Sequence, residues 1–482
     1  MSAVAPQTTQ SQGQASDQQG LARGAIGLPG VLMQSITTVA PAIGMLFTIQ
    51  FIASFAGVAA PLGYLLSFVL VLAIAACVSQ LARQLPNSGG FFTYISRTVH
   101  PRVGWLTGHL MVLYMPAATF TSPIFLCVLL QQELDGSKLG WNIPWWLIFL
   151  AITGVVLTLM YRGVTISAKA MLILGLAEIA VVFLLSAWGV VDPGPGGLNL
   201  EGFNPSNTST HGLWFAVVFS VFALSGWESA APLAEETAEP RRNIPRALMG
   251  AVLLMGLLFT FCAWGLTLGW GTDRIDTLVS SEELPAFTLA KQYWGALWWA
   301  VPLALLNSCI AVSIACMNAS TRMWFSMARA GSLPSWLTGL HPKYRTPVNA
   351  LKLQAAITLV VGIGLGAWWG GSDLFFVSGL LFTLCASWFY IWANIGVIRF
   401  FTGEKRAQFN FVAHILLPVL TSVALLYVCW QTFTNPAPTG RGAWALPIFL
   451  VWAGIGIAAL LIMRARGREQ WLLKAGEEVY EG

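Results

Sequence analysis

The sequence predicts an all-α integral membrane protein of twelve transmembrane helices, built as a five-plus-five inverted repeat with two extra C-terminal helices. Of its 482 residues, 56% are hydrophobic and only 9% are charged, and the mean hydropathy is +0.70. Soluble domains do not have this balance, and runs of about 20 apolar residues are long enough to cross a bilayer. The expected spans are 31–55, 62–81, 103–130, 144–160, 168–190, 212–233, 247–270, 297–327, 353–369, 375–397, 412–430 and 443–463.

The distribution of basic residues predicts the orientation. If the N-terminus is cytoplasmic, 21 of the 25 Lys and Arg residues fall on the inner side, and only Lys138, Arg274, Lys291 and Arg441 fall outside. Basic residues concentrate in cytoplasmic loops. We therefore expect a multi-pass protein of the plasma (inner) membrane with both termini in the cytoplasm. The net charge of +5 then reflects topology and indicates no nucleic-acid partner.

The spans divide the chain into segments with different expected roles. The seven cysteines are isolated within spans, so we expect no disulfide, metal site or cofactor. No phosphate-binding GxxxxGK[ST] motif is present, so the chain itself does not use ATP. The expected segments are a disordered cytoplasmic tail (1–30), a first five-helix repeat (31–190), an extracellular loop (191–211), a second five-helix repeat (212–399), helices 11 and 12 as scaffold or oligomer contact (400–463), and a cytoplasmic C-terminal tail (464–482).

The first span carries a proline in its middle. Pro41 lacks an amide hydrogen and disfavours helix at Ala40, so we expect the helix to break near position 40. The half that follows would present free amides and a positive dipole end, which suit a carboxylate. A simple proline kink is the alternative. The candidate substrate-binding residues here are Ser35, Thr37, Thr38, Ala40, Pro41 and Ala42.

The sixth span has a second expected break, at Ser225-Gly226, close to the ionisable Glu228. Carbonyl groups freed near Ala223 would suit an ammonium group. Breaks in the first span of each repeat indicate a binding site between the two repeats. A site for both a carboxylate and an ammonium group fits an α-amino acid, so we expect a small-molecule substrate of that kind.

Two carboxylates inside spans are candidates for proton coupling. A carboxylate is costly in hydrocarbon and marks a functional site by default. Glu228 lies beside a break, which favours coupling, whereas Glu178 in span 5 could equally be a permanently protonated structural group. Phe222 could close the site as a lid, and Trp227 and Cys316 could contact substrate, although packing is the alternative for all three.

Four sequence blocks resemble the amino acid-polyamine-organocation permeases, which share the LeuT-like inverted-repeat fold. One of these blocks, residues 86–94, lies between spans 2 and 3. We also expect an interfacial amphipathic helix there, over 91–95. The blocks are Phe222 to Glu228 followed by EETAEPRRNIPR (235–246); Pro86, Ser88-Gly89-Gly90 and Tyr94; Ser320-Thr321-Arg322 with MARAGSLP (327–334); and Ala40-Pro41-Ala42 in place of the family's glycine-rich segment.

The resemblance implies a secondary-active amino acid permease that works by alternating access. In such a protein the segment at Ala40-Pro41-Ala42 binds the substrate carboxylate, carbonyls near Phe222 bind the amino group, and Glu228 is proton-linked. Some members have a lysine where Glu178 stands. We expect proton symport of a neutral amino acid, with sodium as the other candidate ion. An exchanger, an amine or polyamine carrier, and a membrane receptor without net transport are the alternatives; an enzyme is not expected.

Overall fold

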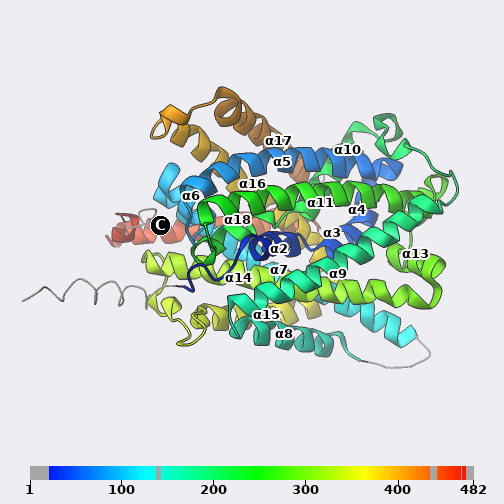
Figure 1. The fold of residues 1–482 in the computed structure, drawn as a ribbon, viewed down its shortest axis with the longest axis horizontal. Coiled ribbons are helices and arrows are strands. Elements are labelled where there is room, and N and C mark those ends of the chain that lie inside the picture. The colour runs from blue at the N-terminus through cyan, green and yellow to red at the C-terminus, as the bar shows by residue number, and fades with distance from the viewer. Residues whose placement is uncertain (1–20, 137–142, 435–441, 468, 474–482) are drawn as a thin grey trace, which may run out of the picture.

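The computed structural model describes residues 21–136, 143–434, 442–467 and 469–473. Eleven described helical segments are long and apolar enough to cross a membrane, and the shorter apolar helix α8 (Trp145–Tyr161) supplies the remaining predicted span. Apart from two isolated bridges, the described residues form no β-structure. The predicted all-α fold with twelve spans is therefore confirmed, and most helices run side by side along the long axis of the molecule (Figure 1).

The first group of five spans begins with an interrupted helix. Three short helices replace one continuous span, and a short turn leads to the second span. The elements are α2 (Leu28–Val39), α3 (Pro41–Leu46), α4 (Thr48–Ala56), η1 (Gly57–Ala59), α5 (Ala60–Gln84), α6 (Phe91–Thr98), α7 (Pro101–Gly136), α8 and α9 (Val164–Val191), followed by η2 (Glu201–Phe203) and η3 (Pro205–Asn207).

The second group also begins with an interrupted span. Its elements are α10 (Thr210–Leu224), η4 (Trp227–Glu236), α11 (Pro240–Trp270), η5 (Thr272–Arg274), α12 (Ile275–Val279), α13 (Pro285–Trp294), η6 (Gly295–Trp299), α14 (Ala300–Arg329), η7 (Ser335–Thr338), α15 (Val348–Trp369) and α16 (Gly371–Thr402). The chain continues with η8 (Arg406–Gln408), η9 (Val412–Leu416), α17 (Leu417–Thr434), η10 (Gly442–Trp444), α18 (Ala445–Ala465) and η11 (Gln470–Leu473).

Three short helices differ from what the sequence predicts. The helix after span 2 exists as α6, but seven of its eight side chains are buried in protein, so its apolar face does not lie on a lipid surface. It packs against α7 and α16 instead. Helices α12 and α13 lie outside the predicted spans because neither segment is a long apolar run.

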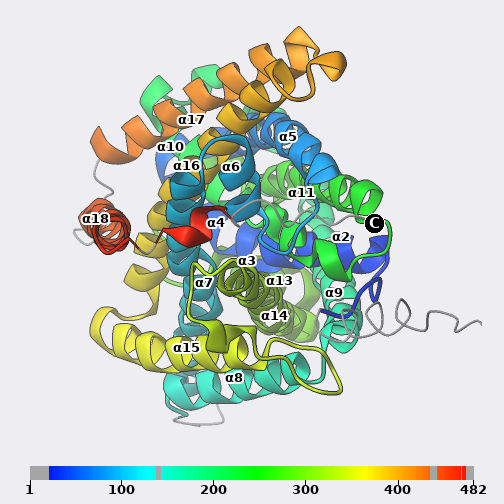
Figure 2. The same cartoon turned by 90° about the vertical axis from the view of Figure 1, so that its left-hand side faces the viewer.

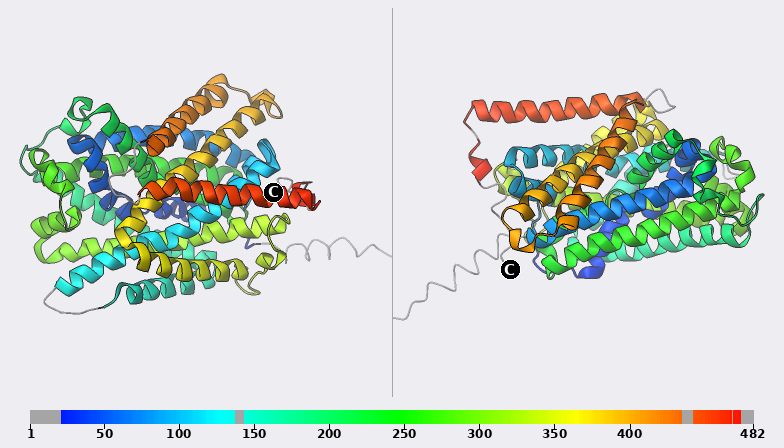
Figure 3. Two further views of the ribbon diagram at one scale, coloured as in Figure 1. Left: turned by 180° about the vertical axis from the view of Figure 1, so that it is seen from behind. Right: turned by 90° about the horizontal axis from the view of Figure 1, so that it is seen from above.

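The broken helices occupy the centre of the molecule. Figure 2 looks along the helices and shows α3 and α4 surrounded by longer helices, whereas α17 and α18 lie at the edge. The right-hand view of Figure 3 also shows α18 at the edge. Figure 2 faces the end of the molecule at which α5 finishes and α11 begins. We call this the basic end, because Arg83 lies in the last turn of α5, Arg241 in the first turn of α11 and Arg329 at the end of α14. It is the end expected to face the cytoplasm.

Candidate functional site

Span 1 breaks at Ala40. Helix α2 ends at Val39, Ala40 has a φ of 56°, and α3 restarts at Pro41. This left-handed conformation is uncommon for a residue with a side chain. Helix α2 stops here because proline disfavours a right-handed helical conformation in the residue before it. The break that Pro41 predicts is therefore present where the sequence places it.

Span 6 breaks at Ser225 and Gly226. Ser225 is extended, Gly226 has a φ of 106°, and the chain continues as the 3₁₀ helix η4. A Cβ atom at Gly226 would lie 2.8 Å from the carbonyl oxygen of Thr38, so glycine is needed for space as well as conformation. The Thr38 and Ser229 hydroxyls lie 2.6 Å apart, which joins the two broken spans directly.

A cavity lies where the two breaks meet. Seven of the predicted binding residues line it, and they come from both broken spans and from α14: Thr38, Ala40, Phe222, Ala223, Ser225, Gly226 and Cys316. Neither Lys, Arg or His nor any carboxylate is among its lining residues in the described structure. The remaining lining residues were not predicted from the sequence: Val39, Ile43, Gly44, Thr48, Tyr114, Met115, Ala118, Ser122, Val312, Phe375 and Phe382.

The other five predicted binding residues lie around the breaks but do not line the cavity. The Ser35 hydroxyl donates to the carbonyl of Trp227 at 2.5 Å, and the Thr37 hydroxyl donates within its own helix. Trp227 is buried and stacks on Tyr390, with ring centroids 5.5 Å apart. Pro41 and Ala42 form the first turn of α3. These residues shape and join the two breaks.

Of the two candidate coupling residues, Glu228 accepts more hydrogen bonds than Glu178. Its side chain is buried, and its Oε1 accepts from the Tyr114 hydroxyl of α7 at 2.9 Å. Its Oε2 accepts from the Tyr390 hydroxyl of α16 at 2.8 Å and from the Gly226 amide at 3.1 Å. One carboxyl group therefore connects the broken span 6 to two other spans. In the sequence, the only feature that marks Tyr114 is that it is a polar aromatic residue within an apolar run.

Glu178 lies behind the break of span 1 and does not line the cavity. Its Oε2 accepts a 3.4 Å hydrogen bond from the amide of Ala42. The Ser308 hydroxyl of α14 lies next to the carboxyl group, whose Oε1 has no hydrogen-bond partner among the described residues. The Glu178 carboxyl group thus already accepts a hydrogen bond from one of the amides expected to bind the substrate carboxylate.

Phe222 leans on α16 at one wall of the cavity. Its ring centroid lies 5.7 Å from that of Phe375 and 6.0 Å from that of Phe382. Between these rings, a Cβ atom added to Gly379 would lie 3.1 Å from the Phe222 ring. The absence of a side chain at Gly379 therefore makes room for the predicted lid.

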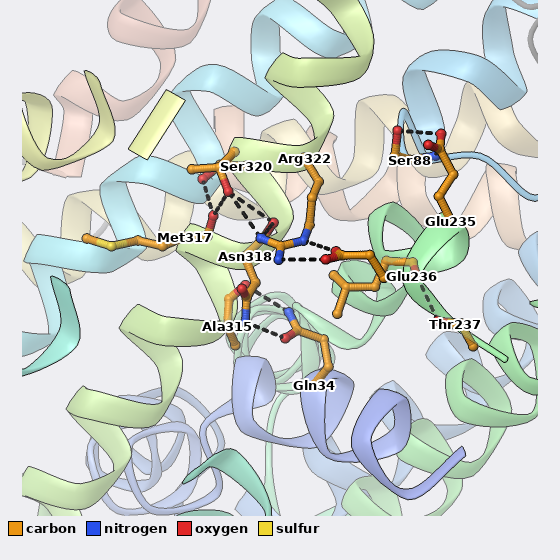
Figure 4. Close-up of polar contacts among 12 residues, drawn as sticks. Gln34, Ser88, Glu235, Glu236, Thr237, Ala315, Met317, Asn318, Ser320 and Arg322 are labelled. Atoms are coloured by element: carbon orange, nitrogen blue, oxygen red, sulfur yellow. Dashed lines mark hydrogen bonds and ion pairs between the residues drawn. The ribbon is translucent and has the colours of Figure 1, made fainter. Parts of the chain in front are cut away.

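Two ion pairs join η4 to α14 towards the basic end. Figure 4 shows the one between Glu236 and Arg322. Glu236 pairs with Arg322, and both side chains are almost completely buried. Glu235 pairs with Arg329 at 2.7 Å and also accepts from the Ser88 hydroxyl at 2.7 Å. These five residues come from three of the four sequence blocks that resemble the permease family. The fold brings the three blocks together here.

Neutral side chains extend this network to the broken span 1. Gln34 donates to the carbonyl of Ala315 at 2.8 Å and accepts from Asn318 at 3.4 Å (Figure 4). Ser320 donates to Gln354 of α15 at 3.0 Å. Asn318 and Ser320 therefore join helices by hydrogen bonds, as polar side chains within membrane spans often do.

Comparison with known proteins agrees with this architecture. Residues 30–471 match the sequence profile of the family described as "Amino acid permease". The chain belongs to the amino acid permease family. This permease is 24% identical over 415 residues to the low-affinity putrescine importer PlaP of Escherichia coli strain K12, covering 83% of this chain and 85% of the relative.

Two Bacillus subtilis relatives match a shorter part of this permease. The serine/threonine exchanger SteT is 26% identical over 311 residues, and the branched-chain amino acid permease BcaP is 25% identical over 326 residues. Each alignment covers 62% of this chain and 67% of the relative. The protein is thus a multi-pass membrane transporter of the amino acid-polyamine-organocation superfamily and not an enzyme.

Proposed function

We propose that this permease carries a neutral amino acid across the plasma (inner) membrane together with a proton. The observation that supports this most directly is the cavity at the meeting point of the two helix breaks. The amino end of α3 suits the substrate carboxylate, and the carbonyl end of α10 suits its ammonium group. Apolar lining residues such as Met115, Val312 and Phe375 suit an uncharged side chain.

Glu228 is the proposed proton acceptor. As a carboxylate it accepts hydrogen bonds from three donors, two of them on other spans. A bound proton removes the charge that strengthens these bonds, because hydrogen bonds to an ionised acceptor are roughly twice as strong as neutral ones. Protonation would thus loosen span 6 from α7 and α16 and couple the proton to the movement of span 6.

The transport cycle would use alternating access with both termini in the cytoplasm. Spans 1, 2, 6 and 7 would move as a bundle against the remaining helices. In this arrangement the pairs Glu236–Arg322 and Glu235–Arg329 close the cytoplasmic side, because η4 belongs to the bundle and α14 does not. Phe222 would close the opposite side over bound substrate.

An amine or polyamine is the second candidate substrate. It is favoured by Glu178, because the Ala42 amide already donates to this side chain. Pro41 supplies no amide, so the α3 terminus offers fewer donors to a substrate carboxylate. The cavity also lacks any basic residue that would repel a cation.

Ligand-induced stabilisation separates the two substrate classes. The purified permease in detergent would be heated with each of the twenty amino acids and with a series of amines and polyamines. A ligand that binds the folded state raises the melting temperature. Stabilisation by neutral amino acids supports the first candidate, and stabilisation by amines alone replaces it with the second.

Uptake into proteoliposomes tests transport and coupling. We expect an inwardly directed proton gradient to drive accumulation of the ligand in sodium-free buffer. Glu228→Gln keeps the size of the side chain but cannot titrate, so it should bind the ligand and lose gradient-driven uptake. Unchanged driven uptake would exclude Glu228 from coupling. Uptake that depends on sodium would replace proton symport by sodium symport. Uptake that depends on ligand preloaded inside would replace it by exchange. Binding without uptake would indicate a receptor.

A further inference from the structure

A second cavity lies at the basic end between α5 and α11, and it shares no lining residue with the cavity at the helix breaks. Helices α5 and α11 pack along each other and lie side by side in Figure 2. Four of the six residues that line the cavity are arginines, and none is acidic: Arg83, Gln84, Arg241, Arg242, Pro245 and Arg246. Such a concentration of guanidinium groups around one hollow is suited to an anion.

At three of its four arginines, the positive charge of this cavity is poorly balanced by the residues that the structure describes. Arg83 and Arg246 form no ion pair with any residue that the structure describes. Arg242 pairs with Glu239 at 3.4 Å, but the two side chains are 61% and 68% exposed, so the pair is weak. Guanidinium groups bind phosphate oxygens through paired N–H donors, which makes a phosphate the best-matched anion.

An apolar strip continues from the cavity along α11. Residues 246, 253 and 257 lie on one face of the helix, because seven and eleven residues are close to whole numbers of turns. Leu253 and Leu257 are 46% and 55% exposed, whereas Val252 and Met255 are buried. Leu253 begins the strip roughly 10 Å along the helix from Arg246, at 1.5 Å per residue.

We propose that this cavity binds the phosphate headgroup of an anionic phospholipid in the cytoplasmic leaflet. Arg83, Arg242 and Arg246 hold the phosphate, and an acyl chain lies on Leu253 and Leu257. The apolar strip favours a lipid over a free phosphate, since a soluble ion gains nothing from it. Basic pockets on the cytoplasmic side of membrane helices are suited to such headgroups. Because α5 and α11 are spans 2 and 7, the lipid would be attached to the bundle that is proposed to move.

Lipid titration of the purified permease tests the site. Dioleoylphosphatidylglycerol would be added to the protein in detergent and binding followed by native mass spectrometry and by melting temperature. Dioleoylphosphatidylcholine and inorganic phosphate at equal concentration serve as controls. The first is a zwitterionic lipid that has a phosphate but no net charge, and the second is a free phosphate. We expect phosphatidylglycerol to bind and stabilise the protein, and the two controls to have little effect.

Charge-matched variants locate the binding. In Arg83→Gln/Arg242→Gln/Arg246→Gln we expect the apparent affinity for phosphatidylglycerol to fall about a hundredfold, at about fivefold for each arginine near the membrane surface. The control Arg399→Gln/Arg464→Gln/Arg466→Gln removes the same charge from other exposed sites and should keep the affinity within about twofold. If the triple variant does not fold, the single variants Arg83→Gln and Arg246→Gln replace it in the test. Each should bind phosphatidylglycerol about fivefold more weakly.

Three results would overturn the proposal. Unchanged phosphatidylglycerol affinity in the triple variant and in both single variants would show that the lipid does not bind at this cavity. Equal losses in the triple variant and its control would indicate a general effect of net charge. Stabilisation by inorganic phosphate as large as that by the lipid, lost in the triple variant alone, would assign the cavity to a soluble phosphate. None of these measurements depends on which substrate the permease carries.

Discussion

Replacing Glu236 by glutamine tests whether the buried ion pair closes the basic end of the permease. The side chains of Arg322 and Glu236 are 0% and 2% exposed. Removing the charge of one partner leaves the other buried and unpaired, which costs about 3–5 kcal/mol. Glu235→Gln is the matched control, because Arg329 and Glu235 are 29% and 12% exposed and water can solvate the unpaired guanidinium. We expect that variant to cost ~1–2 kcal/mol.

Thermal unfolding in detergent measures the difference. A chain of 482 residues loses about 1 °C of melting temperature per kcal/mol, from an unfolding entropy of about 2.1 cal/mol/K per residue. Glu236→Gln should therefore lower the melting temperature by about 3–5 °C and Glu235→Gln by about 1–2 °C. The double variant Glu236→Leu/Arg322→Met removes both charges and should recover most of the loss, since apolar pairs often replace buried ion pairs without cost.

Reactivity of a native thiol reports on closure itself. Cys316 lines the cavity at the helix breaks, so a maleimide that enters from the basic end reaches it only if that end opens. We expect Glu236→Gln to speed labelling of Cys316 severalfold more than Glu235→Gln does. Equal small changes in melting temperature and in labelling for the two variants would refute the reasoning, because burial would then make no difference to the pair.

Two further substitutions test the walls of the cavity. Gly379→Ala places a Cβ atom 3.1 Å from the Phe222 ring and should weaken substrate binding severalfold in calorimetry. The same substitution should have little effect when Phe222→Ala is already present. Additive effects of the two substitutions would contradict a contact between residues 222 and 379. Glu178→Gln keeps an acceptor for the Ala42 amide without the charge, so it should bind amino acids more tightly and amines more weakly; an unchanged ratio of the two affinities would mean that Glu178 does not influence the choice of substrate.

Local chemistry explains why both helix breaks could be predicted from the sequence. Pro41 lacks an amide hydrogen whatever surrounds it, and Gly226 adopts a φ of 106° at little cost. Helix lengths follow from apolar run lengths in the same way, which is why the twelve spans agree with the structure. α13 was missed because its ten residues include polar ones and because it packs on protein, so no long apolar run marks it.

The partners of the site residues could not be predicted, because they depend on how distant helices pack. Tyr114 and Tyr390 lie 114 and 162 residues away from Glu228, and neither has a sequence pattern that distinguishes it from a packing aromatic. Most of the missed cavity residues lie on α3, α7 and α16. The sequence marks an interrupted helix, but it does not mark which side of a continuous apolar helix faces it.

At the basic end, the sequence motifs do not say which glutamate pairs with which arginine. Helix geometry explains the pairing. Arg322 and Arg329 are seven residues apart, so they lie on one face of α14 and about 10 Å apart along it. Glu235 and Glu236 are neighbours on η4, so their side chains leave that helix in different directions. One glutamate can therefore reach the deeper arginine and the other only the shallower one. The pairing of Glu236 with Arg322 in the interior, and of Glu235 with Arg329 nearer the surface, follows from this difference in helix geometry and assigns the larger energetic role to the inner pair.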